Sequence, residues 1–311
     1  MRVAFICSAA HSGSTLLDLL LGSHPEAVSL GEITHLPKNL ALNTACTCGA
    51  PARDCRVWAR ILDAVEQIPA FRSLRQDPYV LNLGLIKASD VIDRRQQTAA
   101  RMAYRKVAYS LCYANLRWGV PIGTIYEQAL GAPARNKLLL FDAVAKVLAK
   151  RLVVDSSKHY LEAVSLYRSA PSDVRVILLV RDGRGVYYSA LKRGRSYSAA
   201  VNAWEQTYRR ALPILERHVH RTHLLKVRYE DLAEAPEREL RRLCSFLGVT
   251  YDAEMLEFAA KEHHILNGNN MRFNPDGQIR PDLSWRQHLS PVDLSYFYAR
   301  AGRLNRLLGY Q

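Results

Sequence analysis

Serine and threonine hydroxyls surround a glycine in the stretch SAAHSGST, which follows an apolar run and leads into a leucine-rich run with helical spacing. A loop that joins a strand to a helix aims backbone N–H groups at an anion, and the helix dipole favours negative charge at the same place. Gly13 lets the backbone approach a ligand closely. Further hydroxyl donors come from Ser12, Ser14 and Thr15. The stretch therefore predicts a phosphate-binding loop, with a plain helix-capping turn as the alternative.

The nucleotide-binding pattern G-x-x-x-x-G-K-[ST] is matched only in part by this loop. Ser14 stands where the lysine belongs, and Ser8 stands at the first glycine. Because that lysine contacts the phosphates of a nucleotide, a P-loop-type kinase or other nucleotide-dependent phosphotransferase is the less favoured interpretation. Its best support is Asp155, which ends the apolar run RLVVD, whereas Asp142 in LLLFD lies in a helical pattern.

A second polar turn, RDGRG, follows the strongest predicted strand, VRVILLV. Arg181 ends that strand, and Ser189 lies eight positions later on the helix that follows. Arg193 is four residues further and falls on the same side of that helix. Two arginines and a hydroxyl near a helix start suit a phosphate, whereas a surface salt-bridge cluster is the simpler alternative.

Strands that alternate with helices must position these two turns. We expect strands over residues 2–7, 27–30, 151–157, 174–180 and 222–232. We expect helices over residues 14–21, 161–170, 181–194, 236–247 and 291–308. Such alternation implies parallel βαβ units. The predicted fold is therefore α/β, a P-loop-like parallel β-sheet flanked by helices, in a single domain over residues 1–311 with a helical insertion at about 36–150, after the second strand.

Together these motifs resemble the sulfotransferases that use 3′-phosphoadenosine 5′-phosphosulfate (PAPS), and the similarity is closest to the protein-tyrosine and carbohydrate branches. The family's first-loop pattern, [RK]-S-G-[ST]-T-x-L followed by H-P, is represented here by HSGSTLL and GSHP. Its R-D-x-R turn, with a serine eight positions after the first arginine, is represented by RDGRGVYYS. A third pattern, Y-E-[DQ]-L before a helix that ends in F-L-G, is represented by YEDL and SFLG. The matched segments span residues 2–35 and 152–250.

The resemblance implies a PAPS-dependent sulfotransferase that moves a sulfuryl group from PAPS to a hydroxyl or amine acceptor by in-line transfer. The residues implied at the 5′-phosphosulfate are His11, Ser12, Gly13, Ser14 and Thr15. Those implied at the 3′-phosphate or near the nucleotide are Arg181, Ser189, Arg193, Tyr229 and Arg286. The donor brings its own leaving group, so no metal is required for the reaction.

The resemblance also implies roles in catalysis for three residues. In the protein-tyrosine branch a Gly-Glu pair after the second strand carries the base, and the stretch SLGEITHL places Glu32 there. A lysine after the third strand assists the reacting sulfate, and Lys158 in VVDSSKHY is the nearest match, although its spacing to RDGR differs. His11 stands where the family has Arg or Lys. One interpretation is that protonated His11 replaces that cation. The alternatives are that Lys158 contacts the sulfate in its place, or that His11 only packs against the helix.

The basic balance of the chain, a net charge of +14 and a pI of about 9.6, suggests an anionic partner. A nucleic-acid-binding protein is the non-enzymatic alternative, but the chain shows neither aromatic and basic stripes nor a helix-turn-helix pattern, so no nucleic acid is expected. No apolar run approaches the roughly 20 residues of a membrane span, so we expect no transmembrane segment and a cytoplasmic location. The acceptor is a small molecule, a sugar, a lipid or a peptide.

Three cysteines in the stretch CTCGAPARDC form a further cluster. Cys46, Cys48 and Cys55 could hold zinc, but a structural zinc site has four ligands. The candidates for the fourth ligand are His35 and Cys112. A disulfide is the alternative, and a cytoplasmic location disfavours it. One more pair, His263 and His264, matches ordinary surface or core histidines better than a catalytic cluster.

Overall fold

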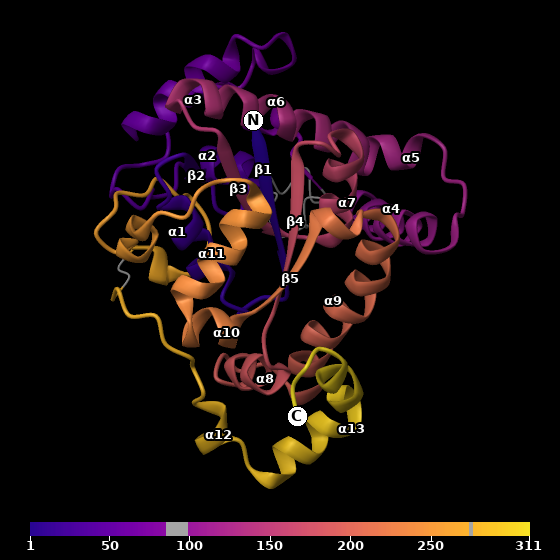
Figure 1. The fold of residues 1–311 in the computed structure, drawn as a ribbon. Coiled ribbons are helices and arrows are strands. Elements are labelled where there is room, and N and C mark those ends of the chain that lie inside the picture. Colours follow the sequence, from indigo (N-terminus) through magenta and orange to yellow (C-terminus); the bar gives the residue numbers. More distant parts are fainter. Residues whose placement is uncertain (85–98, 274–275) are drawn as a thin grey trace.

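Strand β1 runs through the middle of a five-stranded sheet whose order is β2-β3-β1-β4-β5 (Figure 1). The computed structural model describes residues 1–84, 99–273 and 276–311. Its strands are β1 (Arg2–Ser8), β2 (Ala27–Ser29), β3 (Leu152–Lys158), β4 (Val174–Val180) and β5 (Leu224–Arg228). Every pairing is parallel, so the carboxyl ends of the strands meet at one edge of the sheet. The predicted parallel sheet flanked by helices is confirmed.

Helices cover both faces of this sheet. They are α1 (Ser14–Gly22), α6 (Ala132–Leu148), α7 (Tyr160–Ser169), α8 (Gly183–Leu191), α9 (Tyr197–His218), α10 (Tyr229–Glu234), α11 (Pro236–Leu247), α12 (Trp285–His288) and α13 (Pro291–Leu307). Helices α1 and α11 pack on one face, and α6, α7 and α9 pack on the other. Helices α8, α12 and α13 lie beyond the carboxyl ends of the strands, where the two predicted phosphate-binding turns also lie (Figure 1).

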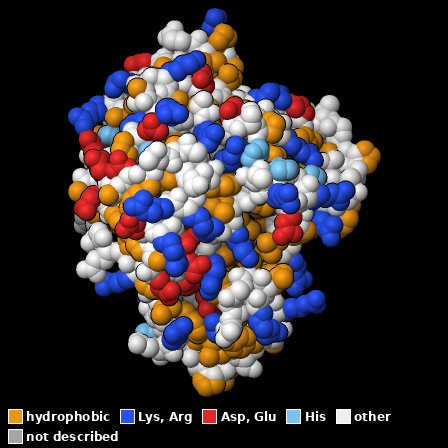
Figure 2. Space-filling model, in the orientation of Figure 1, with side chains coloured by type: hydrophobic (Ala, Val, Ile, Leu, Met, Phe, Trp, Pro, Cys, Tyr) orange, Lys and Arg blue, Asp and Glu red, His pale blue; other side chains and the backbone are white. Residues whose placement is uncertain are grey.

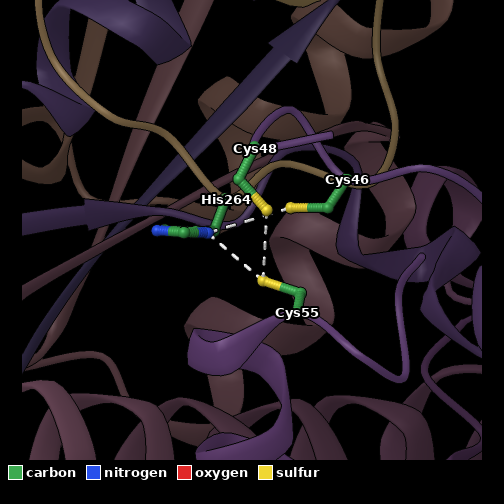
Figure 3. A group of neighbouring side chains, drawn as sticks. All are labelled: Cys46, Cys48, Cys55 and His264. Atoms are coloured by element: carbon green, nitrogen blue, oxygen red, sulfur yellow. Dashed lines mark hydrogen bonds between the residues drawn. The ribbon is translucent and has the colours of Figure 1, made fainter. Parts of the chain in front are cut away.

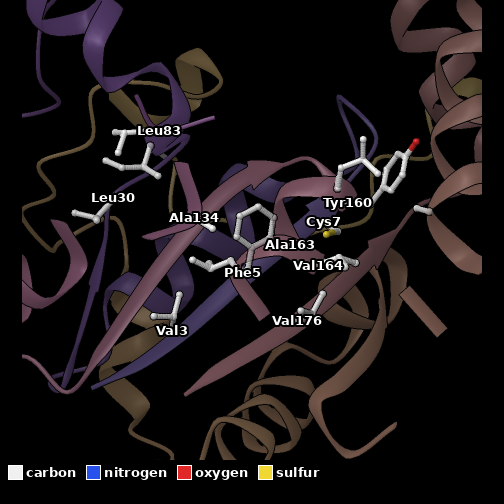
Figure 4. Close-up of a cluster of buried hydrophobic side chains, with 14 of the residues drawn as sticks. Val3, Phe5, Cys7, Leu30, Leu83, Ala134, Tyr160, Ala163, Val164 and Val176 are labelled. Atoms are coloured by element: carbon white, nitrogen blue, oxygen red, sulfur yellow. The ribbon is translucent and has the colours of Figure 1, made fainter. Parts of the chain in front are cut away.

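The central strands are buried on both faces, which explains their nearly continuous apolar sequence. Along β1, Val3, Phe5 and Cys7 belong to the core on one face, whereas Ala4 and Ile6 belong to the core on the other. Figure 4 shows the first of these cores, where the β1 side chains lie among residues of β4 and of the covering helices. This packing holds the carboxyl ends of β1 and β4 side by side, with Ser8 opposite Leu179.

The segment between β2 and β3, predicted to be a helical insertion, contains several helices. They are α2 (Leu36–Ala41), α3 (Arg56–Glu66), α4 (Ala99–Trp118), α5 (Thr124–Tyr126) and α6. A π-helical turn at Glu127–Gly131 joins α5 to α6, and an isolated bridge pairs Ala45 with Pro51. Residues 85–98 of the predicted insertion lie outside the described residues.

Two parts of the fold differ from the prediction. Strand β5 ends at Arg228 and Tyr229 begins α10, so the strand predicted over 222–232 is too long. The prediction also contains no helix at the position of α9, which has 22 residues and carries Pro213 in its interior. Because proline removes a backbone donor, it argues against a helix in the sequence alone, and tertiary packing overrides that local preference here.

Basic side chains are spread over the face of the molecule shown in Figure 2, where acidic side chains lie between them. The net charge of +14 is therefore not gathered into a single block on this face. Among the helices of the described residues, none combines the length and the apolar character that crossing a membrane requires.

Candidate active site

The loop between β1 and α1 has a left-handed backbone at two positions. Gly13, the N-cap of α1, has a φ of 88°, and His11 has a φ of 63°. A Cβ atom at Gly13 would lie 2.4 Å from the ring of Tyr229, so only glycine fits against that tyrosine. No side chain caps the start of α1, which leaves its first backbone N–H groups available to an anion.

Tyr208 on α9 supports this loop from the buried side. Its hydroxyl donates to the Leu179 carbonyl at 2.8 Å, accepts from the Ala9 N–H at 3.2 Å and lies 3.2 Å from Ser12 Oγ. Ser12 is fully buried, so its hydroxyl points to Tyr208 and does not line the cleft. Tyr208 is not among the predicted site residues, because helix α9 is itself not predicted. The available signal was an aromatic pair at helical spacing, since Trp204 precedes Tyr208 by one turn.

Arg181 joins three loops at the carboxyl edge of the sheet. Its Nη1 donates to the His11 carbonyl at 3.0 Å, and its Nη2 donates to the Asp282 carbonyl at 3.1 Å and to Asp282 Oδ2 at 2.9 Å. Its guanidinium carbon lies 4.5 Å from the ring centroid of Tyr229, a cation–π contact. The loop after β1, the turn after β4 and the segment around Asp282 therefore meet around one largely buried guanidinium, beside Tyr229 at the start of α10.

A cleft of about 870 Å³ opens at this edge and brings most of the predicted site residues together. Those that line it are His11, Gly13, Ser14, Thr15, Glu32, Lys158, Arg181, Ser189, Arg193 and Tyr229. Arg286 does not line it, and its guanidinium lies beside Trp285, 5.6 Å from the ring centroid. Most of the remaining wall comes from segments 268–271 and 276–284.

Ser189 and Arg193 lie on the same side of the end of α8, as their spacing predicts. Arg193 Nη1 donates to Ser189 Oγ at 2.6 Å and to the Ser189 carbonyl at 2.9 Å. The hydroxyl and the guanidinium therefore face the cleft as one unit.

Glu32 and Lys158 form an ion pair in the cleft, between Glu32 Oε1 and Lys158 Nζ. The two side chains are 17% and 20% exposed, so solvent and a ligand can reach both. Gly31, just before Glu32, has a φ of 65°, and a Cβ atom there would lie 2.6 Å from the Asn267 carbonyl. Glycine is therefore required at position 31 for the chain to turn Glu32 into the cleft.

Cations surround His11 in the free protein. Burial lowers the pKa of His11 below its ordinary value of 6.5, and the charges of Arg193, Lys158 and Arg181 lower it further. The charges of the neighbouring side chains therefore favour the neutral imidazole in the free protein. A bound anion would reverse that balance.

Asp155, the best support for a kinase, is buried away from the cleft. Lys137 Nζ lies 2.9 Å from Asp155 Oδ2 and 2.9 Å from Glu162 Oε2, and all three residues are almost completely buried. Despite the opposing effect of burial, the two carboxylates hold the pKa of Lys137 above its usual value. This cluster ties α6, β3 and α7 together and leaves Asp155 no free access to a nucleotide-bound metal.

The strand order sorts the residues of the cleft into two groups. Glu32 follows β2 and Lys158 ends β3, and both strands lie on one side of β1. Arg181 and Tyr229 follow β4 and β5 on the other side. The His11 loop, which follows the central strand, lies between the carboxylate–lysine pair and the arginine cluster.

Comparison with known proteins identifies the class of protein that this fold and site define. The chain belongs to the sulfotransferase family, whose sequence profile matches residues 4–253. The resemblance drawn from the motifs is therefore confirmed, and sulfuryl transfer is the reaction of this family.

Individual relatives agree with that assignment. A protein of Caenorhabditis briggsae named "Putative protein-tyrosine sulfotransferase" is 30% identical over 135 residues, which cover 41% of this chain and 45% of the relative, less than half of its length. The sulfotransferase domain from the curacin biosynthetic pathway superposes with a TM-score of 0.52 at 18% identity, covering 100% of this chain and 98% of that domain. Sulfotransferase STF9 from Mycobacterium avium gives a TM-score of 0.50 at 14% identity, covering 100% and 77%. These two likenesses show the fold.

Proposed function

We propose that this chain uses PAPS as its donor and transfers the sulfuryl group to a hydroxyl or amine acceptor bound in the same cleft. The observation that carries the proposal is the meeting of two anion-binding turns. The two turns follow β1 and β4, which are neighbouring strands of the sheet. A hydrogen bond of 3.0 Å from Arg181 to the His11 carbonyl joins one turn to the other. A nucleotide with an anionic group at each end suits two such turns at one cleft.

The donor would be held by residues from both sides of β1. Backbone N–H groups at the start of α1 and the hydroxyls of Ser14 and Thr15 would hold the 5′-phosphosulfate. The 3′-phosphate would be held by Arg181, Ser189 and Arg193, with Tyr229 near the nucleotide. Arg286 would reach the same phosphate only if α12 moved, because its side chain lies outside the lining of the cleft.

The chemistry would be an in-line transfer through a loose transition state. The acceptor oxygen or nitrogen forms a bond to sulfur while the bond from sulfur to the bridging oxygen of the 5′-phosphate breaks. The bonding pair leaves with 3′-phosphoadenosine 5′-phosphate (PAP), and the acceptor proton passes to the carboxylate of Glu32. Lys158 and protonated His11 would neutralise the departing oxygen. Nothing in this scheme requires a metal.

The acceptor would lie on the side of β1 where Glu32 follows β2. Peptide tyrosine, sugar hydroxyls, lipid headgroups and small molecules all carry a suitable nucleophile. Because the curated relative is named for protein tyrosine, a tyrosine peptide is the first acceptor to test.

Incubation of the purified chain with PAPS and a panel of these acceptors tests the proposal. We expect PAP and a sulfated product to form in equal amounts with at least one acceptor, and titration calorimetry with PAP to show binding. No binding of PAP, together with phosphate transfer from magnesium-ATP, would favour the kinase interpretation in its place. The burial of Asp155 against Lys137 gives that interpretation no structural support.

A further inference from the structure

Three thiols and one imidazole converge where the segment between β2 and β3 meets the chain that follows α11 (Figure 3). The four residues are Cys46, Cys48, Cys55 and His264, whose ligand atoms all lie within 4.8 Å of one another. We propose that they bind one zinc ion. Of the two candidates named from the sequence for the fourth ligand, His35 and Cys112, neither belongs to this group of described residues.

The distances between the ligand atoms suit a tetrahedral zinc ion. With Zn–S near 2.3 Å and Zn–N near 2.0–2.1 Å, a tetrahedral site separates two sulfurs by about 3.8 Å and a sulfur from a nitrogen by about 3.6 Å. Here Cys48 Sγ lies 3.6 Å from Cys55 Sγ. His264 Nδ1 lies 3.2 Å from Cys55 Sγ and 3.9 Å from Cys46 Sγ. Small side-chain adjustments therefore bring all four atoms to one metal ion.

A carboxylate lies behind the histidine, as at many zinc sites. His264 turns Nδ1 to the thiols, and its Nε2 lies 3.4 Å from Glu262 Oε1. A proton on Nε2, bonded to the carboxylate, leaves the Nδ1 lone pair free for the metal. The second oxygen of Glu262 pairs with Arg56, which fixes the carboxylate in turn. Hydrogen bonds among thiols alone would not require this arrangement.

The chain around the cysteines is already folded into a tight turn. The Cys46 N–H donates to the Ala50 carbonyl at 2.8 Å, and the Gly49 N–H donates to the Cys46 carbonyl at 2.9 Å. Gly49 has a φ of 88°, which favours glycine. Cys46 and Cys55 are fully buried and Cys48 is exposed, so a metal ion has an access route from solvent.

A disulfide explains this cluster less well than zinc does. One bond could join Cys48 to Cys55, but it would leave a third buried thiol and an oriented imidazole without a role. Three thiolates and a neutral histidine, in contrast, supply the complete ligand set of a Cys3His structural site.

The position of the site links it to the edge of the proposed donor cleft. Beside the cluster, the Ile265 N–H donates to Thr47 Oγ1 at 2.9 Å, and the Thr47 N–H donates to the Ile265 carbonyl at 3.2 Å. A few residues further, Gly268 and Asn269 line the cleft, and the Asn269 N–H donates to Thr15 Oγ1 at 3.2 Å. Zinc would therefore anchor a wall of the cleft without touching the reacting groups.

Metal content of the full chain is the direct test. Protein purified with a phosphine reductant and without chelators should carry one zinc per chain. Replacement of zinc by Co²⁺ should give the tetrahedral absorption bands of cobalt with thiolate charge transfer. We expect H264A and C46S to lose the metal, and E262Q to weaken zinc affinity about 10- to 100-fold, the usual effect of losing a carboxylate behind a ligating histidine.

Two matched variants serve as controls. The ring of His263 donates from Nε2 to the Phe258 carbonyl, 2.9 Å away, and Cys112 is a buried thiol outside the cluster, so H263A and C112A should both keep the zinc. Wild-type protein without bound zinc would overturn the proposal. So would a mass two hydrogens lower, from a Cys48–Cys55 disulfide, in protein purified without the reductant. So would equal zinc in H264A, C46S and the controls. If H264A or C46S fails to fold, the cobalt spectrum of the wild-type chain decides, and absence of thiolate charge transfer overturns the site.

Discussion

The guanidinium of Arg181 lies 2.9 Å from the carboxylate of Asp282, so an internal anion holds the arginine that we assign to the 3′-phosphate. Burial alone would raise the pKa of Asp282. Hydrogen bonds from Ser284 and Arg181 outweigh that effect and hold the pKa below its usual value, so the carboxylate stays charged. Asp282 is half exposed, whereas Arg181 is nearly buried. A nucleotide phosphate would therefore have to compete with a carboxylate that can move away into solvent.

Replacing Arg181 by alanine should weaken nucleotide binding strongly. Charge-assisted hydrogen bonds contribute about 1.5–3 kcal/mol, so we expect the Kd for PAP to rise about 10- to 100-fold or more in R181A. Titration calorimetry measures the change, and thermal unfolding checks that the loops around His11 and Asp282 stay folded. Wild-type affinity in a folded R181A protein would remove Arg181 from the donor site.

Replacing Asp282 by asparagine should have the opposite effect. The substitution removes the competing charge but keeps the shape of the side chain, and a half-exposed ion pair contributes up to about 1 kcal/mol, so we expect the Kd for PAP to fall about three- to fivefold in D282N. Asp276 also lines the cleft and pairs with Arg280, not with Arg181, so D276N is the matched control for a general change in charge. Equal effects of D282N and D276N would contradict direct competition at Arg181.

Loss of the Glu32 carboxylate should slow turnover without weakening donor binding. If Glu32 accepts the acceptor proton, E32Q should reduce kcat at least about 100-fold. The Kd for PAP should stay unchanged or fall, because Lys158 loses its anionic partner and becomes available to the nucleotide. Glu234 is exposed on α10 and absent from the cleft, so E234Q should behave as wild type. Turnover within threefold of wild type would exclude Glu32 as the base.

Nucleotide affinity should depend on pH through His11. Its pKa lies below 6.5 in the free protein, and a bound polyanion raises it, so binding takes up a proton. The extra affinity that protonated His11 provides is complete below the pKa of His11 in the free protein. It disappears as pH rises through the pKa of His11 in the complex. We therefore expect the Kd for PAP to fall as pH is lowered from 8 toward 5, beyond the small effect of protonating the phosphates themselves.

The variant H11N separates these contributions, because asparagine tolerates the left-handed backbone at position 11 but does not titrate. The phosphates of PAP titrate equally with both proteins, so the difference between the two curves reports His11. Parallel curves for wild type and H11N would show that His11 does not change its protonation on binding.

Protein stability should depend on pH through Asp18, in the helix that follows the phosphate loop. Burial raises the pKa of Asp18 to about 7, despite hydrogen bonds from Ser29 and Ser156. The pKa of Asp18 in the folded state exceeds the unfolded value of 3.8. The contribution of Asp18 to the free energy of unfolding is therefore fully present at low pH, where Asp18 is neutral in both states, and is lost as pH rises to about 7. Urea unfolding should show D18N to be more stable relative to wild type at pH 8 than at pH 5, by about 2–4 kcal/mol. The same difference at both pH values would contradict this.

The sequence predicts best those parts of the fold that local patterns encode. VRVILLV predicts β4 with both of its ends, and the motif loops lie where the ends of β1 and β4 require them. Helix α9 is not predicted, because Pro213 and a largely polar sequence obscure the helical spacing of its buried residues. Tyr208, which lies on that helix, is therefore not predicted either. The end of β5 is misplaced because the pattern YEDL is equally compatible with a first helical turn.

Contacts between distant segments are beyond such patterns. The Asp282 carboxylate at Arg181 comes from 101 residues away. His264 meets Cys55 from 209 residues away. Each contact depends on how loops fold back over the edge of the sheet, which neither periodicity nor a short motif encodes. The sequence therefore supplies three thiols, and only the fold supplies the imidazole that makes them a complete set of ligands.

The order of the strands has a consequence for how new acceptors can arise in this family. Helices α2 to α6 are inserted between β2 and β3, beside Glu32, whereas the arginines proposed for the donor follow β4 and α8 on the other side of β1. Apart from the cysteine turn at residues 46–55, residues 36–150 can therefore diverge, lengthen or be exchanged while the residues proposed to bind the donor are inherited unchanged. Grafting that segment from a relative should transfer a preference for acceptors and leave the affinity for the nucleotide as it was.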